Sequence, residues 1–198
     1  MKTLSTGSLA LLGLALSASA GAIAAQTSEA VRVRIVTELG DVIAEVYPQQ
    51  APVTAGNFLR YLDAGSFGGG SFFRTVRADN QPDDSVRIGV IQGGPPRGPQ
   101  AFPPIPLERT SLTGLHHLDG TLSMARSGPD TARGQFFICI SDQPELDFGG
   151  ARNQDGQGFA AFGRVLEGMD IVRQIQAGAA DGQRLNPTVE ILRVERVA

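Results

Sequence analysis

Hydrophobic and polar residues alternate along much of the chain beyond position 30, with the period of two that a half-buried β-strand requires. The clearest case is Val31–Thr37, where valine or isoleucine alternates with arginine. The turn residues Glu38–Asp41 separate this segment from a returning strand, so the two segments form a predicted hairpin. The predicted strands are Val31–Thr37, Val42–Tyr47, Ser71–Val76, Val86–Gln92, Thr121–Ala125, Gln135–Ser141, Phe159–Val165 and Val189–Val197.

Two segments have the period of a helix instead. Pro52 stands where proline opens a helix, and Gly65 stands where glycine closes one. The segment Glu167–Gln176 carries apolar residues on one helical face and is followed by Gly178 as a stop signal. Both helices are therefore predicted to bury one face. The apolar residues of the first helix, at i, i+3, i+4 and i+7, are Ala55, Phe58, Leu59 and Leu62.

These elements indicate a fold dominated by β-structure, because the predicted strands are joined by hairpin-like connections and do not alternate with helices. Eight antiparallel strands can close into a barrel whose interior is filled by side chains, with one of two helices capping each open end. The 25 glycines and 12 prolines agree with a fold that has many turns. Apolar residues make up 41% and charged residues 19% of the 198 positions, as in a globular chain of one domain.

Charge and cysteine content exclude several functions. The net charge of −3 argues against a nucleic-acid partner held by bulk charge. Cys139 is the only cysteine, so neither an intramolecular disulfide nor a zinc site built from cysteines is possible. We expect Cys139 to be a buried and unreactive thiol.

The beginning of the chain has the layout of a secretory signal peptide. Lys2 supplies a positive charge, the apolar segment Ser8–Ala18 follows it, and small residues then provide cleavage sites, such as Ala18-Ser19-Ala20. The apolar segment is too short to span a bilayer comfortably, although a transmembrane anchor is the alternative interpretation. We therefore predict a signal peptide at residues 1–25 and one mature domain at 26–198, exported to the periplasm or secreted and not held at a membrane after cleavage.

Familiar catalytic motifs are missing from the sequence. It has no Gly-x-Ser-x-Gly motif, and Gly68–Gly70 does not continue into a P-loop. The pair His116–His117 has no further ligands at a suitable spacing, and adjacent side chains point apart, so we expect structural or solvated histidines and no metal site. Asp142, Glu145 and Asp147 are predicted to lie in a polar turn. No cofactor is expected.

One charged residue lies in an unexpected place. Arg74 follows two phenylalanines within a strand-like run, where a guanidinium without partners is costly to bury. Either Arg74 faces water, or it lies in a site that uses its five N–H donors. Gln92 and Gln135, on neighbouring predicted strands, are suited to hold such an arginine or to bind a peptide backbone.

Several motifs together resemble the cyclophilin family of peptidyl-prolyl cis–trans isomerases, and the resemblance runs from about Val31 to Val197. Each motif alone is moderately specific, but their common order along the chain is very specific. The matching segments are Pro52–Phe58, Phe72–Val76, Val90–Gly94, Gly120–Arg126, Gly134–Ile138, Phe162–Val165 and Glu167–Val172.

The resemblance implies an eight-stranded antiparallel barrel capped by two helices, with a substrate groove on the outside of the barrel. It implies that Arg74 is the catalytic residue and that no metal or cofactor is used. The substrate-binding residues that it implies are Val90, Gln92, Ala125, Arg126, Gln135, Phe137, Leu146 and Phe159.

The function that the resemblance implies is acceleration of X-Pro bond rotation in exported proteins, with proline-containing polypeptides as substrates and a monomer as the expected state. The alternative is a proline-peptide binding or chaperone-like scaffold with little turnover. Three departures from the family pattern bear on this choice. Gly89–Val90 replaces a phenylalanine–methionine pair, Phe159 replaces a histidine, and Glu145 lies near the position of a frequent tryptophan. We therefore expect a reshaped proline pocket.

Overall fold

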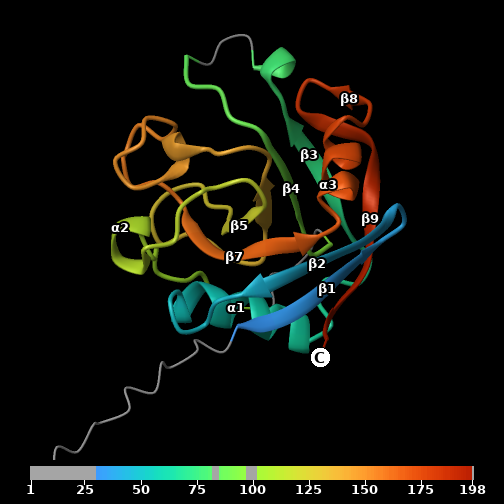
Figure 1. The fold of residues 1–198 in the computed structure, drawn as a ribbon, viewed down its shortest axis with the longest axis horizontal. Coiled ribbons are helices and arrows are strands. Elements are labelled where there is room, and N and C mark those ends of the chain that lie inside the picture. The colour runs from blue at the N-terminus through green and yellow to red at the C-terminus, as the bar shows by residue number, and fades with distance from the viewer. Residues whose placement is uncertain (1–29, 82–84, 97–101, 198) are drawn as a thin grey trace, which may run out of the picture.

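One antiparallel sheet closes on itself in the computed structural model, which describes residues 30–81, 85–96 and 102–197 (Figure 1). Its strands are β1 (Val31–Thr37), β2 (Gly40–Val46), β3 (Gly70–Val76), β4 (Val90–Gly94), β5 (Thr121–Met124), β6 (Phe136–Cys139), β7 (Ala160–Glu167), β8 (Ala180–Asp181) and β9 (Arg184–Arg196). The order is β1-β2-β7-β5-β6-β4-β3-β9, and pairing of β1 with β9 completes the ring, while β8 extends β9 as a short hairpin. The predicted eight-stranded barrel is confirmed. The predicted signal peptide lies outside the described residues.

Helices cover the barrel at separate places. The α-helices are α1 (Pro52–Asp63), α2 (Thr110–Thr113) and α3 (Met169–Gln176), and the 3₁₀ turns are η1 (Ala78–Asn80) and η2 (Pro144–Leu146). In Figure 1, α1 lies at the lower end of the barrel and α3 lies to the right, against β2 and β3. The single-turn α2 was not predicted, because four residues are too few to show a helical period. Within the described ranges, no helix is long and apolar enough to cross a membrane.

One strand begins later than its sequence pattern predicts. The pattern placed its start at Val86, but β4 begins at Val90. The reason is a side chain, because Gln81 Nε2 donates to the carbonyl of Ile88 at 2.8 Å and Gln81 Oε1 accepts from the Ile88 amide at 3.2 Å. The backbone of Ile88 is thereby bonded to Gln81 and does not join the ladder.

The strands next to the pocket carry apolar residues on both faces. In β6, Phe136 and Ile138 point into the barrel core, whereas Phe137 and Cys139 belong to a second cluster on the outer face. Phe136 packs on Phe58 of α1 with their ring centroids 5.5 Å apart, which fixes the helix at the end of the barrel. The outer cluster also contains Val76, Ile88, Val90 and Leu146. A small apolar surface therefore exists outside the main core.

The prediction of a buried Cys139 is confirmed, because the residue has no exposed surface. Burial raises the pKa of its thiol well above the usual value, and nearby carboxylates raise it further. The thiol is therefore protonated and unreactive at neutral pH.

The first turn of α1 is capped by a residue from a distant part of the chain. The N-cap residue, Ala51, has no side-chain acceptor, so the first amides of the helix need another partner. The carboxylate of Glu108 supplies it: Oε1 accepts from the amide of Val53 at 3.1 Å, and Oε2 accepts from that of Thr54 at 2.6 Å. Its charge also suits the positive end of the helix dipole. This carboxylate ties the segment before α2 to α1.

Replacing this cap is expected to destabilise the whole domain. Glu108→Ala should lower the free energy of unfolding by about 1 kcal/mol, the usual loss when a helix cap is removed. Urea denaturation followed by circular dichroism measures this change. The matched control is Glu167→Ala, at an exposed glutamate at the end of β7. Equal stability of Glu108→Ala and the unmodified protein would contradict the capping role.

Candidate active site

A small pocket opens on the outer face of the barrel, over the second apolar cluster. Its volume is about 130 Å³. Strands β3, β4 and β6 supply part of its wall, and the residues after β5, η2 and the residue before β7 supply the rest. Eight of the nine residues predicted for the site line this pocket, together with Ile88. The lining residues are Arg74, Ile88, Val90, Gln92, Ala125, Arg126, Phe137, Leu146 and Phe159.

Arg74 is held by two glutamines at the polar side of the pocket. Its Nη1 donates to Oε1 of Gln92 at 2.9 Å, across the register pair that joins β3 to β4. Its Nε and Nη2 both donate to Oε1 of Gln183, at 3.0 and 2.6 Å. Gln183 lies in the turn between β8 and β9, and its carbonyl accepts from the amide of Thr75 at 2.9 Å. The planar guanidinium is thus fixed on two sides, so Arg74 lies in a built site and not on a solvated face.

The contacts of Arg74 also fix the orientation of the neighbouring amide. A guanidinium can only donate, so the Gln92 oxygen must face Arg74 and its NH₂ group must face the other way. That NH₂ group donates to Oε1 of Gln135 at 3.1 Å. The result is a continuous polar row from Gln183 through Arg74 and Gln92 to Gln135. Such a row keeps each member in one orientation.

Gln135 is the one predicted site residue that does not line this pocket. It lines an adjacent hollow of about 330 Å³, which shares Gln92, Ala125 and Arg126 with the pocket. Ser127, Thr131 and Arg133 complete the lining of that hollow. Pocket and hollow therefore form one continuous groove, apolar at one end and polar at the other.

Two aromatic rings form the apolar end. Phe137 and Phe159 meet edge to face, with their ring centroids 5.2 Å apart and their planes at 86°. Leu146 lies fully buried beside them, and its carbonyl accepts from the amide of Phe159 at 2.9 Å. Because these contacts link the segment before β7 to η2, the apolar end is preformed.

Arg126 closes the rim of the pocket with a guanidinium whose three nitrogens each donate one hydrogen bond within the protein. Its two terminal nitrogens donate to the Asp155 carboxylate at 2.8 and 2.9 Å, and Nε donates to the Gly158 carbonyl at 2.8 Å. The guanidinium carbon lies 5.1 Å from the ring centre of Phe159. Hydrogen bonds from Arg126 are the main reason that the pKa of Asp155 falls to about 2. Arg126 and Asp155 are therefore both charged across the neutral pH range, and their ion pair fixes the position of the loop before β7.

Three residues of this arrangement were missed from the sequence. Gln183 and Asp155 lie in turns with no local motif, and only the pairing of β9 with β3 and the path of the loop before β7 bring them to the site. Ile88 is different, because it lies two positions before Val90 and so shares a face with it at the strand period. That signal was present in the sequence.

The histidine pair differs from its prediction. The two side chains were expected to point apart, but Nδ1 of His116 and Nδ1 of His117 both contact the carboxylate of Asp147, at 2.8 and 2.6 Å. The side chain of His117 is completely buried, whereas that of His116 is 60% exposed. No group of three or more metal-ligating side chains occurs in the part of the chain that the structure describes.

Comparison with known proteins gives the family. The model of the family described as "Cyclophilin type peptidyl-prolyl cis-trans isomerase/CLD" matches residues 32–196. Peptidyl-prolyl cis-trans isomerase B of Escherichia coli is 34% identical over 150 residues, which cover 74% of this chain and 84% of that protein. Peptidyl-prolyl cis-trans isomerase A of Dickeya dadantii is 35% identical over 163 residues, covering 82% and 78%.

Solved structures give the same fold. The crystal structure of a Cryptosporidium parvum cyclophilin-type peptidyl-prolyl cis-trans isomerase superposes with a TM-score of 0.69 at 23% identity, covering 85% of this chain and 98% of that one. At this identity the likeness concerns the fold. Since the family model spans every strand that builds the pocket, and bacterial relatives match over most of the barrel, this chain belongs to the cyclophilin-type peptidyl-prolyl cis–trans isomerases, the enzyme family that its motifs predicted.

Proposed function

We propose that this chain accelerates rotation about X-Pro bonds in exported proteins and thereby assists their folding. The observation that carries the proposal is the guanidinium of Arg74, fixed by Gln92 and Gln183 at the edge of a small apolar pocket. A single copy of the chain supplies the whole pocket, which supports action as a monomer.

The reaction breaks no covalent bond. It only disrupts, for the time of the rotation, the partial double-bond character of the amide bond. That bond resists rotation with a barrier of roughly 18–20 kcal/mol, so uncatalysed exchange takes about 10–100 s. A catalyst must bind the twisted amide more tightly than either planar isomer. On twisting, the prolyl nitrogen regains its lone pair and becomes a hydrogen-bond acceptor. A donor that is already fixed beside this nitrogen stabilises the twisted state without reorganisation.

In our proposal the pocket holds the proline ring and Arg74 donates to the prolyl nitrogen. The volume of about 130 Å³ suits one small ring, since pockets for drug-sized ligands measure roughly 300–1,000 Å³. Phe137, Leu146 and Phe159 would contact the ring, and Val90 and Ala125 would close its sides. The chain next to the proline would continue into the hollow lined by Gln135 and Arg126. A structure related to this one was solved in the presence of the dipeptide Ala-Pro, which makes Ala-Pro peptides suitable probes.

The scaffold alternative was favoured by glycine at position 89, where a large apolar residue was expected. The structure gives a physical reason for the glycine: a Cβ atom there would lie 2.9 Å from the carbonyl oxygen of Ile140. The neighbouring Ile88 supplies apolar surface to the same pocket. These two observations favour an intact proline pocket. A binding scaffold would hold Ala-Pro peptides without accelerating their exchange, so exchange by the unmodified protein distinguishes the two functions.

Arg74 provides the sharpest test of the mechanism. Arg74→Ala should lower kcat for an Ala-Pro tetrapeptide by about 10²–10³-fold, the usual effect of removing one preorganised donor, while binding changes much less. Arg74→Lys should be nearly as harmful, because an ammonium group does not reproduce the planar fork. NMR exchange spectroscopy measures the rate, and circular dichroism on the same samples checks the fold.

A matched control is available across the sheet. Arg184 is the β9 partner of Arg74 in the strand register, but it is exposed and does not line the pocket. Arg184→Ala should leave exchange within about twofold of the unmodified rate, since surface changes have small effects. If folded Arg74→Ala catalyses as well as Arg184→Ala, the assigned mechanism is wrong.

Export rests on the signal-peptide pattern before Gln26. Expression of the full chain in a bacterial host should yield a periplasmic or secreted form whose N-terminus lies between Gly21 and Ser28. Intact-mass measurement locates that end. Recovery of a chain that still begins at Met1 in the membrane fraction would instead support the anchor.

A further inference from the structure

A buried histidine lies directly behind the proline pocket. His117 is only 1% exposed, and both of its ring nitrogens are bonded. Nδ1 lies 2.6 Å from Oδ1 of Asp147, and Nε2 lies 2.9 Å from Oγ of Ser123. Burial alone would raise the pKa of Asp147, but hydrogen bonds from His117 and His116 outweigh it and lower that pKa. A carboxylate can only accept, so Nδ1 of His117 carries the proton.

The row Asp147–His117–Ser123 has the order of a hydrolase triad but cannot act as one. Ser123 has no exposed surface and pairs with Phe137 across the β5–β6 ladder, so no substrate carbonyl reaches its hydroxyl. None of the three residues lines the pocket. The three residues therefore have no direct contact with the reacting atoms, and their role is structural.

Its contacts nevertheless reach the walls of the pocket. The imidazole of His117 stacks on the ring of Phe137, with centroids 6.0 Å apart and planes at 14°. Phe159 makes a separate edge-to-face contact with the same ring. Phe137 is thus held by two rings, that of Phe159, which lines the pocket, and that of the buried His117, which does not.

His117 also fixes the turn that carries Leu146. Its backbone carbonyl accepts from the amide of Gln143 at 2.7 Å, immediately before η2. Its backbone amide donates to Oδ1 of Asp147 at 3.1 Å, immediately after η2. The turn is bonded to one residue at both ends, and Leu146 lies between these bonds.

We infer that His117 is a positioning residue for peptidyl-prolyl isomerisation: it touches no substrate but holds Phe137 and Leu146 at the spacing that grips a proline ring. This inference rests on the proposed function. Ring contacts are present in both the planar and the twisted state of the substrate, so loosening them weakens binding in both states. Loss of His117 therefore acts on KM, whereas loss of Arg74 acts on kcat.

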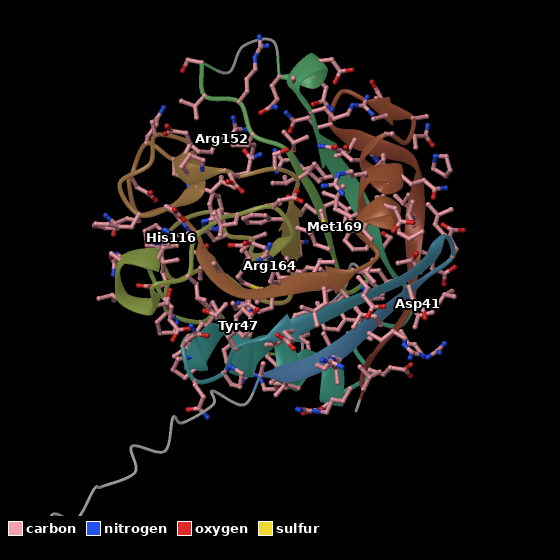
Figure 2. All side chains as sticks on the ribbon, viewed as in Figure 1. Asp41, Tyr47, His116, Arg152, Arg164 and Met169 are labelled. Carbon is pink, nitrogen blue, oxygen red and sulfur yellow. The ribbon has the colours of Figure 1, made fainter. Side chains whose placement is uncertain are left out.

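The neighbouring histidine offers a matched control. His116 contacts the same carboxylate but is exposed, and in Figure 2 it lies at the surface beside α2. His117→Asn keeps a donor at the place of Nδ1 and removes both the stacked ring and the bond to Ser123. His116→Asn makes the same change at a ring that does not stack on Phe137, and it likewise keeps a donor at the place of Nδ1.

The experiment measures exchange of an Ala-Pro tetrapeptide by NMR at several peptide concentrations, at a temperature where melting curves show each variant folded. His117→Asn should raise KM about 3- to 10-fold, the effect of losing one aromatic contact, with kcat within twofold. His116→Asn should leave both constants unchanged. In a Phe137→Leu background, His117→Asn should raise KM much less, because the two residues act through one contact.

Unchanged KM in folded His117→Asn, or equal effects of His116→Asn and His117→Asn, would overturn the inference while leaving the proposed function intact. Absence of exchange in the unmodified protein would instead overturn the proposed function. If His117→Asn does not fold, an NMR measurement on the unmodified protein tests the inference instead. Saturation with the tetrapeptide should then shift the ring signals of His117 more than those of His116, and a smaller or equal shift would contradict the inference.

Discussion

The fixation of one guanidinium between two amide oxygens is the interaction on which the site depends. Gln92 lies 18 positions after Arg74 and reaches it across the β3–β4 pair. Gln183 lies 109 positions after Arg74 and reaches it only because β9 pairs with β3 on the other side. A free arginine would lose side-chain entropy each time it met a substrate, whereas this one has lost that entropy during folding. Pairing of β9 with β3 during folding thus holds the guanidinium in place before any substrate binds.

The pocket also requires a sheet whose two faces both carry packed apolar side chains. Strands β4 and β6 place Ile91, Phe136 and Ile138 in the main core and Val90 and Phe137 in the outer cluster. The core residues keep the barrel rigid, and the outer residues build the apolar end of the groove on that rigid base. Because neighbouring residues of one strand serve the two purposes, a shift of one residue in strand register would exchange the core and pocket residues.

Strand period and helix period predicted the barrel well because they depend on local alternation. The strand Val31–Thr37 is found with the predicted bounds, and α1 begins at the predicted Pro52. The predicted start of β4 was wrong because the side chain of Gln81 forms hydrogen bonds with both backbone groups of Ile88. The alternation of hydrophobic and polar residues does not report such a bond from a side chain to the backbone.

The site was predictable where residues repeat family motifs. Arg74, Phe137 and Leu146 lie in the pocket as the resemblance implied. The supporting residues were not predictable in this way. Gln183 has no motif around it, and the aspartate that joins His116 and His117 is 30 positions beyond the second of them. Their importance follows from burial and hydrogen bonding, which only three-dimensional structure provides.

The claim that Arg74 is fixed before substrate arrives is tested most directly by the rotation of its guanidinium in the free protein. NMR of arginine side-chain nitrogens reports rotation about the Cζ–Nε bond, and the exposed Arg164 serves as an internal reference (Figure 2). We expect separate, slowly exchanging Nη signals for Arg74 and a single averaged signal for Arg164. Equal, fast averaging of both residues would contradict the claim.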